Sequence, residues 1–259
     1  MVRNWEGDNF YVRSVGVNKQ PLSPEEYIGY YKQRAIEAEA EWHNRDRPGY
    51  EALEWFNFHC NDVCLRMMGD ICYGKRLIDL GCGRWGFEQS LIKSLGAKES
   101  VMLDIAGGEG IVEADACDVP FPDSDFDIVI CRELIEHVPS PSKLLSEIWR
   151  LLKPNGFVFI STPNGFNVFP DGKEHVRAYF PNGFLAEIET FGFTILDKRG
   201  DAPNIHLALV PMANGGLVNI LDDFKQIAEM VDEFAYSYYI GTQLFVLAQK
   251  KVETWIKSD

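Results

Sequence analysis

The sequence lacks several features that mark secreted or nucleic-acid-binding proteins. Its cysteines form no Cys-x-x-Cys pair, and the opening residues MVRNWEGDNF contain no apolar core of a signal peptide. We therefore expect reduced thiols in a cytoplasmic protein. The 25 lysine and arginine residues form no basic cluster and are outnumbered by 39 acidic residues. The net charge of −14 repels phosphate polyanions, which argues against a nucleic-acid partner.

One stretch without charged side chains, residues 202–221, is about as long as a membrane span. It contains two prolines, three asparagines and the pair Gly215-Gly216, which suit an uncharged loop better than a lipid-facing helix. We therefore expect no membrane partner. The wider segment 201–235 is instead a candidate lid over the substrate or a contact of a homodimer.

The chain divides into two parts by its pattern of apolar residues. Residues 1–74 predict a helical cap, with a capping signal at Ser23 to Glu26 and a break near Pro48-Gly49. Residues 75–259 predict the core domain, with an insertion at about 201–235. The simpler expectation is that the helical cap covers a face of a sheet. The alternative is that its aromatic residues, Tyr27, Tyr30, Tyr31 and Trp42, close over the substrate.

Apolar strands alternate with helices after residue 75. We expect strands at 76–80, 100–105, 111–113, 126–131, 157–161, 193–197 and 242–248, and helices at 86–95, 141–152, 181–192 and 218–234. Such alternation indicates an α/β fold with a mostly parallel sheet covered on both faces. Ligands of these sheets bind beyond the carboxyl ends of the strands.

The sequence from Gly81 to Gly86 matches the pattern G-x-G-x-x-G after a predicted strand, and Asp104 ends the next strand. This spacing is typical of dinucleotide-binding sites, so an NAD-dependent oxidoreductase using Gly81, Gly83 and Gly86 is one hypothesis. The carboxylate of Asp79, two residues before the loop, opposes a bound pyrophosphate. It suits a cationic ligand, such as the amino group of a methionine moiety.

Further segments extend this motif along the chain, at 78–83, 102–105, 115–121, 126–138 and 151–157. Their residues and order resemble the class I S-adenosylmethionine-dependent methyltransferases. Residues 174–193 more loosely resemble the branch with ubiquinone-type and small-molecule enzymes. Trp85 stands where this family more often has glycine. The resemblance implies a Rossmann-like, doubly wound, mostly parallel seven-stranded sheet with an antiparallel last strand, and S-adenosyl-L-methionine as cofactor.

The resemblance also implies which residues bind the cofactor. Asp104 is expected to accept the ribose hydroxyls, Asp115 and Ala116 to hold adenine, and Asp79 to hold the amino group. The full set of expected cofactor-binding residues is Asp79, Gly81, Cys82, Gly83, Asp104, Ile105, Asp115, Ala116 and Arg132. For Arg132, a surface ion pair with Glu136 is an equal alternative.

The expected reaction is methyl transfer to a small-molecule acceptor, through an oxygen nucleophile on a metabolite, sugar or natural-product intermediate. An oxygen nucleophile needs a base, and His137 and His175 are the catalytic candidates, with His206 left open. The spacing of Asp171, Glu174 and His175 fits no metal template, so we expect no metal site. The alternatives are a non-catalytic protein that binds S-adenosylmethionine and the NAD-dependent oxidoreductase.

Overall fold

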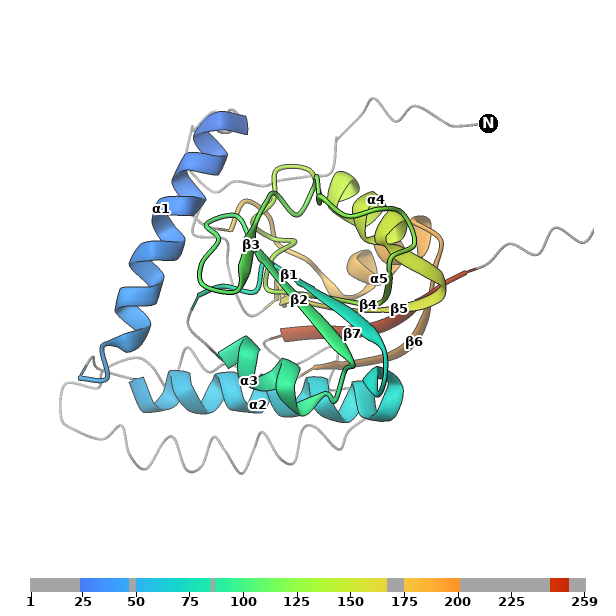
Figure 1. Cartoon of the computed structure of the whole chain (residues 1–259), viewed down its shortest axis with the longest axis horizontal. Helices are drawn as coiled ribbons and strands as arrows, with labels where there is room; N and C mark the ends of the chain where they lie inside the picture. The colour runs from blue at the N-terminus through green and yellow to red at the C-terminus, as the bar shows by residue number, and fades with distance from the viewer. Residues whose placement is uncertain (1–23, 47–49, 85–86, 167–174, 201–242, 252–259) are drawn as a thin grey trace, which may run out of the picture.

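A seven-stranded sheet with helices on both faces forms the centre of the computed structural model, which describes residues 24–46, 50–84, 87–166, 175–200 and 243–251 (Figure 1). The strands are β1 (Arg76–Leu80), β2 (Glu99–Asp104), β3 (Ile111–Glu113), β4 (Phe126–Arg132), β5 (Leu152–Pro163), β6 (Phe193–Gly200) and β7 (Gln243–Lys250). Their order is β3-β2-β1-β4-β5-β7-β6. Only β7 among these strands runs antiparallel to its neighbours, β5 and β6. The doubly wound sheet with an antiparallel last strand is thus confirmed.

Successive residues of the central strands are buried on opposite faces of the sheet. On β4, Ile128 and Ile130 join one core cluster, whereas Val129 and Cys131 join the other. A strand covered on both faces has no polar side to its pattern, so it reads as a continuous apolar run. That is the pattern at 126–131 from which this strand was predicted.

The helices divide between these two cores. Residues of α2 (Tyr50–Met68) and α3 (Phe87–Ser94) pack in the core cluster of Ile128 and Ile130. Residues of α4 (Pro141–Leu151) and α5 (Pro181–Thr190) pack in the core cluster on the opposite face. Figure 1 shows these two pairs on opposite sides of the sheet, and α1 (Pro24–His43) standing beside its β3 edge. A short 3-10 turn, η1 (Gly69–Cys72), connects α2 to β1.

Strand β5 begins earlier than the sequence predicts. The residues Pro154-Asn155-Gly156 indicate a turn before a strand at 157–161, but β5 already begins at Leu152. Its pairing with β4 is irregular between Phe126 and Ile128, and Asn155 has a φ of 62°. A Cβ atom at Gly156 would lie 2.9 Å from the carbonyl oxygen of Lys153. The turn residues therefore form an irregularity inside the strand, where glycine is required for steric reasons.

The other described elements agree with the predicted ones to within a few residues at their ends. The predicted helix at 218–234 and the whole segment 201–235 lie outside the described residues. So do Trp85, Gly86 and His206 of the predicted sites. Among the described helices, none is long and apolar enough to cross a membrane.

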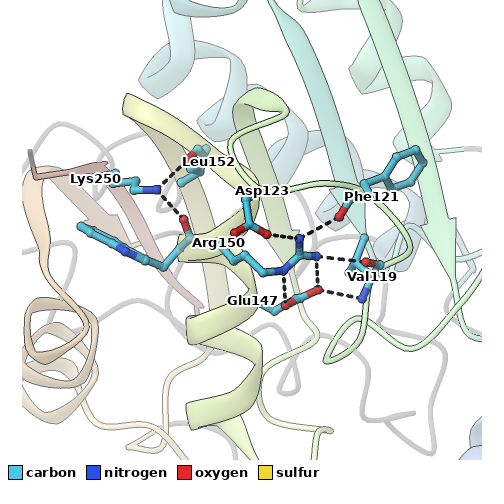
Figure 2. A network of polar contacts seen from close by, with 8 residues as sticks. Val119, Phe121, Asp123, Glu147, Arg150, Leu152 and Lys250 are labelled. Atoms are coloured by element: carbon cyan, nitrogen blue, oxygen red, sulfur yellow. Dashed lines mark hydrogen bonds and ion pairs between the residues drawn. The ribbon is translucent and has the colours of Figure 1, made fainter. Parts of the chain in front are cut away.

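Arg150 on α4 joins this helix to the loop between β3 and β4 (Figure 2). Its guanidinium donates to the carbonyl oxygens of Phe121 (2.7 Å) and Val119 (3.0 Å) and to the carboxylate of Asp123 (2.8 Å). Glu147, one turn earlier, accepts from Arg150 at 2.6 and 2.9 Å and from the Val119 amide at 2.8 Å. The loop that follows the predicted adenine-binding residues is therefore fixed to α4.

Lys250 at the end of β7 joins the same helix to the sheet (Figure 2). Its ammonium group donates to the carbonyl oxygens of Trp149 (2.8 Å) and Leu152 (2.7 Å). Burial lowers the pKa of Lys250, and the two carbonyls accept from two of the three N–H donors of its ammonium group. A cation at the C-terminus of a helix also interacts favourably with the helix dipole. The end of α4 is thus held on two sides.

Replacing Arg150 with alanine is expected to lower the free energy of unfolding by about 2 kcal/mol, because hydrogen bonds from a charged donor to several loop acceptors are lost together. Chemical denaturation followed by circular dichroism measures this. Arg199→Ala is the matched control, since Arg199 pairs with Asp197 two residues away and its side chain is 38% exposed. That change should cost less than about 0.5 kcal/mol. Equal losses for the two variants would contradict the bridging role of Arg150.

Candidate functional site

The glycine loop after β1 lies at the carboxyl ends of the parallel strands. The amides of Gly81 and Cys82 both donate to the carbonyl oxygen of Leu103 on β2, at 2.8 and 3.0 Å. Gly81 and Gly83 have φ values of 69° and 65°, which a side chain disfavours. A Cβ atom at Gly81 would also lie 2.9 Å from Leu134 Cδ1. The loop thus needs glycine both for its backbone conformation and for its close contact with the chain after β4.

Asp104 at the end of β2 holds this loop in place. Its Oδ2 accepts a hydrogen bond from the Gly83 amide at 3.1 Å, and its Oδ1 accepts one from the Ala106 amide at 2.9 Å. Burial raises the pKa of Asp104, and these two amides and the charge of Arg84 oppose that rise. Each carboxylate oxygen can accept a further bond, so Asp104 can still bind a ligand's hydroxyl groups.

A cavity of about 290 Å³ opens beside Asp104. Most of the predicted cofactor-binding residues line it: Gly81, Gly83, Asp104, Ile105, Asp115, Ala116 and Arg132. The sequence analysis did not identify other lining residues, namely Arg34, Asn57, Leu103, Ala114, Glu133, Leu134 and Val138. They come from helices and strand ends that are distant in sequence from the glycine motif. The cavity therefore lies where the sheet topology predicts a ligand.

Asp79 and Cys82 are not among the lining residues that the structure describes. Asp79 is 1% exposed within β1, and its charge raises the pKa of the Cys64 thiol on α2, where burial is the main cause. Arg132 is buried too, and it donates to Asn61 Oδ1 on α2 at 2.6 Å. That contact replaces the surface ion pair with Glu136 that was the alternative for Arg132.

Helix α1 forms one wall of the cavity, through Tyr27, Tyr31, Ala35 and Ala38. Ion pairs connect it to both sides of the site, from Lys32 to Glu113 on β3 and from Glu39 to Arg84 in the glycine loop. The expectation that the cap covers a sheet face is therefore confirmed for α2 but is wrong for this face of α1. Its helical periodicity predicted a buried face, and periodicity alone cannot tell a sheet from a ligand cavity.

Asp115, in the segment after β3, also lines the cavity. One of its carboxylate oxygens accepts a hydrogen bond from the Cys117 amide at 2.8 Å. The negative charges of Asp115 and Asp104 are among the causes that raise the pKa of Tyr27, of which burial is the largest. The hydroxyl group of Tyr27 is thus neutral, and the negative charges of Asp104 and Asp115 favour this neutral form.

The chain after β4 forms another end of the cavity. Glu133 has a φ of 48°, an unusual value for a residue with a side chain, and its carboxylate accepts from Ser161 at 2.8 Å. His137 lines the cavity, with its Nδ1 atom 3.5 Å from the Tyr31 hydroxyl. The His175 ring contacts the His137 ring in a tilted arrangement, with 4.9 Å between the ring centroids, although His175 is not among the lining residues described.

Glu136, which precedes His137 in the chain, is buried and only 2% exposed. Its Oε2 accepts from the Thr162 hydroxyl at 3.0 Å, and its Oε1 lies 3.7 Å from His137 Nε2. Burial raises the pKa of Glu136 to about 8. One ligand atom each from Glu136, His137 and His175 falls within 4.8 Å of the others, a grouping that the sequence analysis missed. His175 is distant in sequence from Glu136 and His137, so spacing alone gave no signal for this grouping of three side chains.

Sequence comparisons match this chain to methyltransferases. Residues 78–160 match the methyltransferase domain family. A probable S-adenosylmethionine-dependent methyltransferase of Mycolicibacterium smegmatis is 27% identical over 67% of this chain and 73% of that protein. The ubiquinone biosynthesis O-methyltransferase of Paracidovorax citrulli is 33% identical over 42% of this chain. The chain spans about half of that enzyme's length, 54%.

Solved structures share the fold at low sequence identity. A Burkholderia thailandensis 1,6-didemethyltoxoflavin-N1-methyltransferase, solved with 1,6-didemethyltoxoflavin and S-adenosylhomocysteine, has a TM-score of 0.59 and 14% identity over 94% of this chain and 99% of that chain. The [4+2]-cyclase SpnF has a TM-score of 0.58 and 17% identity over 90% of this chain and 98% of that chain. These likenesses establish the fold alone.

Gly81→Ala is expected to lower the free energy of unfolding by about 2–4 kcal/mol, since it combines a left-handed backbone with a close contact to Leu134. Thermal and chemical denaturation measure the loss. Two glycines separate the causes, because a Cβ atom would meet no atom within 4 Å at Gly110 or Gly29. Gly110→Ala, at a φ of 73°, should cost about 1–2 kcal/mol. Gly29→Ala, in helix α1, should stabilise slightly. A Gly81→Ala loss no larger than that of Gly110→Ala would contradict the close contact.

Proposed function

We propose that this class I S-adenosylmethionine-dependent methyltransferase transfers its cofactor's methyl group to an oxygen atom of a small-molecule acceptor. The chain is assigned to this class of enzymes by its motif order, its seven-stranded sheet and the methyltransferase domain matched over residues 78–160. S-adenosyl-L-methionine is therefore its cofactor. The acceptor, the methylated atom and the roles of individual residues are the proposed part.

The residues of the cavity fit this cofactor. The left-handed glycines 81 and 83 bring backbone amides close to a ligand that a side chain would keep away. Asp104 offers acceptor sites for two ribose hydroxyls, and Asp115 offers one for the adenine amino group. Asp79, buried behind the glycine loop, contributes its negative charge toward the cationic amino group. When bound, the cofactor supplies an electrophilic methyl group on a sulfonium.

His137 on the cavity wall is the observation that carries the proposal of an oxygen acceptor. Methyl transfer is an in-line displacement, so the acceptor must approach the methyl group from the side opposite the sulfur. An oxygen acceptor must also lose its proton. His137 lines the cavity, and the His175 ring lies 4.9 Å from its ring in a tilted arrangement, so two imidazoles are near enough to serve as the base. We propose these two as the catalytic residues.

The size and walls of the cavity support a small acceptor. Helix α1 forms one wall of the cavity of about 290 Å³ and is held by ion pairs at both sides. The net charge of −14 disfavours nucleic acid. The ubiquinone O-methyltransferases among the relatives methylate oxygen by their names, which supports the same chemistry here. In this view, residues 1–74 form the cap domain and residues 75–259 the catalytic core.

Asp104→Ala is expected to weaken S-adenosyl-L-methionine binding by about 10- to 100-fold, because charge-assisted hydrogen bonds contribute about 1.5–3 kcal/mol. Titration calorimetry measures the affinity. Asp118→Ala is the control with the same charge change, since Asp118 is exposed and is not among the described lining residues. A parallel titration with NADH should show no binding. Binding of NADH alone would restore the oxidoreductase reading of the glycine loop.

His137→Ala is expected to slow methyl transfer by at least about 100-fold while cofactor affinity is retained. S-adenosylhomocysteine formation is followed over a panel of phenols, catechols and sugars, with mass spectrometry to identify the methylated atom. His59→Ala is the control, because His59 lies on α2 and is not among the described lining residues. Undiminished transfer to an oxygen acceptor by His137→Ala would remove His137 from the mechanism. Cofactor binding without any turnover would favour a non-catalytic binding protein.

A further inference from the structure

We propose that Glu136, His137 and His175 together bind a divalent transition-metal ion of the zinc type at the acceptor end of the cavity. The inference of metal binding stands on these side chains, and the catalytic role given to the metal rests on the proposed function. The ligand set is one carboxylate and two imidazoles, which is a common donor set for zinc in enzymes.

The three side chains already converge. One ligand atom from each lies within 4.8 Å of the other two, and Glu136 Oε1 is 3.7 Å from His137 Nε2. Zinc binds nitrogen and oxygen at about 2.0–2.2 Å, so two ligands of one tetrahedral ion lie roughly 3.4 Å apart. The ligand atoms therefore need to approach one another by no more than about 1.4 Å, the difference between 4.8 Å and 3.4 Å.

Glu136 is the strongest indication that a cation belongs here. Its side chain is 2% exposed, and no hydrogen bond within the described part of the chain reaches its Oε1 atom. A buried carboxylate with an unsatisfied oxygen is costly unless a cation or donor lies against it. A divalent ion between Oε1 and the two imidazoles is such a cation.

Surrounding contacts orient the ligands. The Val176 amide donates to the Glu136 carbonyl at 3.0 Å, which holds the segment of His175 against Glu136 and His137. Thr162 donates to Glu136 Oε2, and this leaves Oε1 on the side of the imidazoles. The Tyr31 hydroxyl lies 3.5 Å from His137 Nδ1, so Nε2 is the nitrogen that faces Glu136. Such outer contacts are typical of functional metal sites.

Three protein ligands leave a fourth position of the ion open, as in catalytic zinc sites. His137 lines the cavity, so we place this open position toward the acceptor. With the metal bound, His137 and His175 act as its ligands and no longer as the proton acceptor. An acceptor hydroxyl bound at the open position then has a lowered pKa and releases its proton to water. Its oxygen lone pair then forms the new bond to the methyl carbon. The carbon–sulfur bond breaks, its electron pair returns to sulfur, and S-adenosylhomocysteine is released.

The experiment uses the full chain, stripped with a chelator and titrated with zinc chloride by calorimetry. We expect about one equivalent to bind. Glu136→Gln and His175→Ala should each weaken zinc binding by at least about 100-fold. His59→Ala, a histidine on α2 outside this cluster, should bind zinc as the unchanged chain does. Circular dichroism of each metal-free variant verifies folding.

Cobalt(II) serves as a second probe that does not depend on any variant. Coordination by nitrogen and oxygen gives visible d–d bands without the near-ultraviolet charge-transfer band of a thiolate ligand. That spectrum in the unchanged chain, even where a variant fails to fold, supports the site. A thiolate band, absent binding, or binding unaffected by both variants would overturn it.

The two proposals fail separately. Metal bound at the cluster with no methylation of any oxygen acceptor would contradict the proposed function and leave the metal site standing. Oxygen methylation at an undiminished rate in chelator-stripped protein would overturn the catalytic role of the metal and leave the proposed function standing. Full loss of transfer on stripping, restored by zinc in the unchanged chain but not in Glu136→Gln, supports both.

Discussion

The carboxylate of Asp104 is the contact on which the site depends. It joins the end of β2 to the glycine loop after β1, through the Gly83 amide, and to its own following turn through Ala106. A buried carboxylate is stable only when several donors reach it, so these two segments cannot separate without exposing a charge to an apolar interior. The left-handed glycine loop is thereby kept in one conformation beside the cavity. Such preformed shape reduces the entropy that binding costs.

Local patterns were sufficient to predict the strands, and the resemblance to class I methyltransferases implied the doubly wound sheet with its antiparallel last strand. Most of the residues predicted to bind the cofactor line the cavity. Asp104, Asp115 and the glycines each follow a buried strand, and parallel strands bring their carboxyl ends to one edge. Asp79 and Cys82 also belong to or precede the motif, but neither is among the described residues that line the cavity, so their roles toward the cofactor stay predictions. Side chains alternate along a strand, and Asp79 is on the sheet face of Leu77, which packs in the core of α2.

The acceptor end was predictable only in part, because it is assembled from segments that are remote in sequence. His137 and His175 could both be named from their places in the chain, but their contact with each other and with Tyr31 and Glu136 could not. Tyr31 comes from α1, and His175 is placed by the backbone hydrogen bond from Val176 to Glu136. Helical periodicity predicted that α1 has a buried face without indicating that this face covers a cavity. Glu136 reads as one more helix-forming residue until its burial and its neighbours are known.

The fold by itself does not determine which reaction this cavity supports. A cyclase and an N-methyltransferase share the architecture with this chain at similar TM-scores. What can differ between such proteins is the chemistry opposite the methyl group. Here that end holds the buried carboxylate of Glu136, two imidazoles in ring contact and Glu133 with a positive φ; a buried carboxylate and an unusual backbone conformation both lower stability. A binding module has no need of such groups at the far end from its ligand's adenine. Their presence beside the wall that α1 forms therefore supports the proposal that the acceptor end removes a proton from a nucleophile and does not only bind the cofactor.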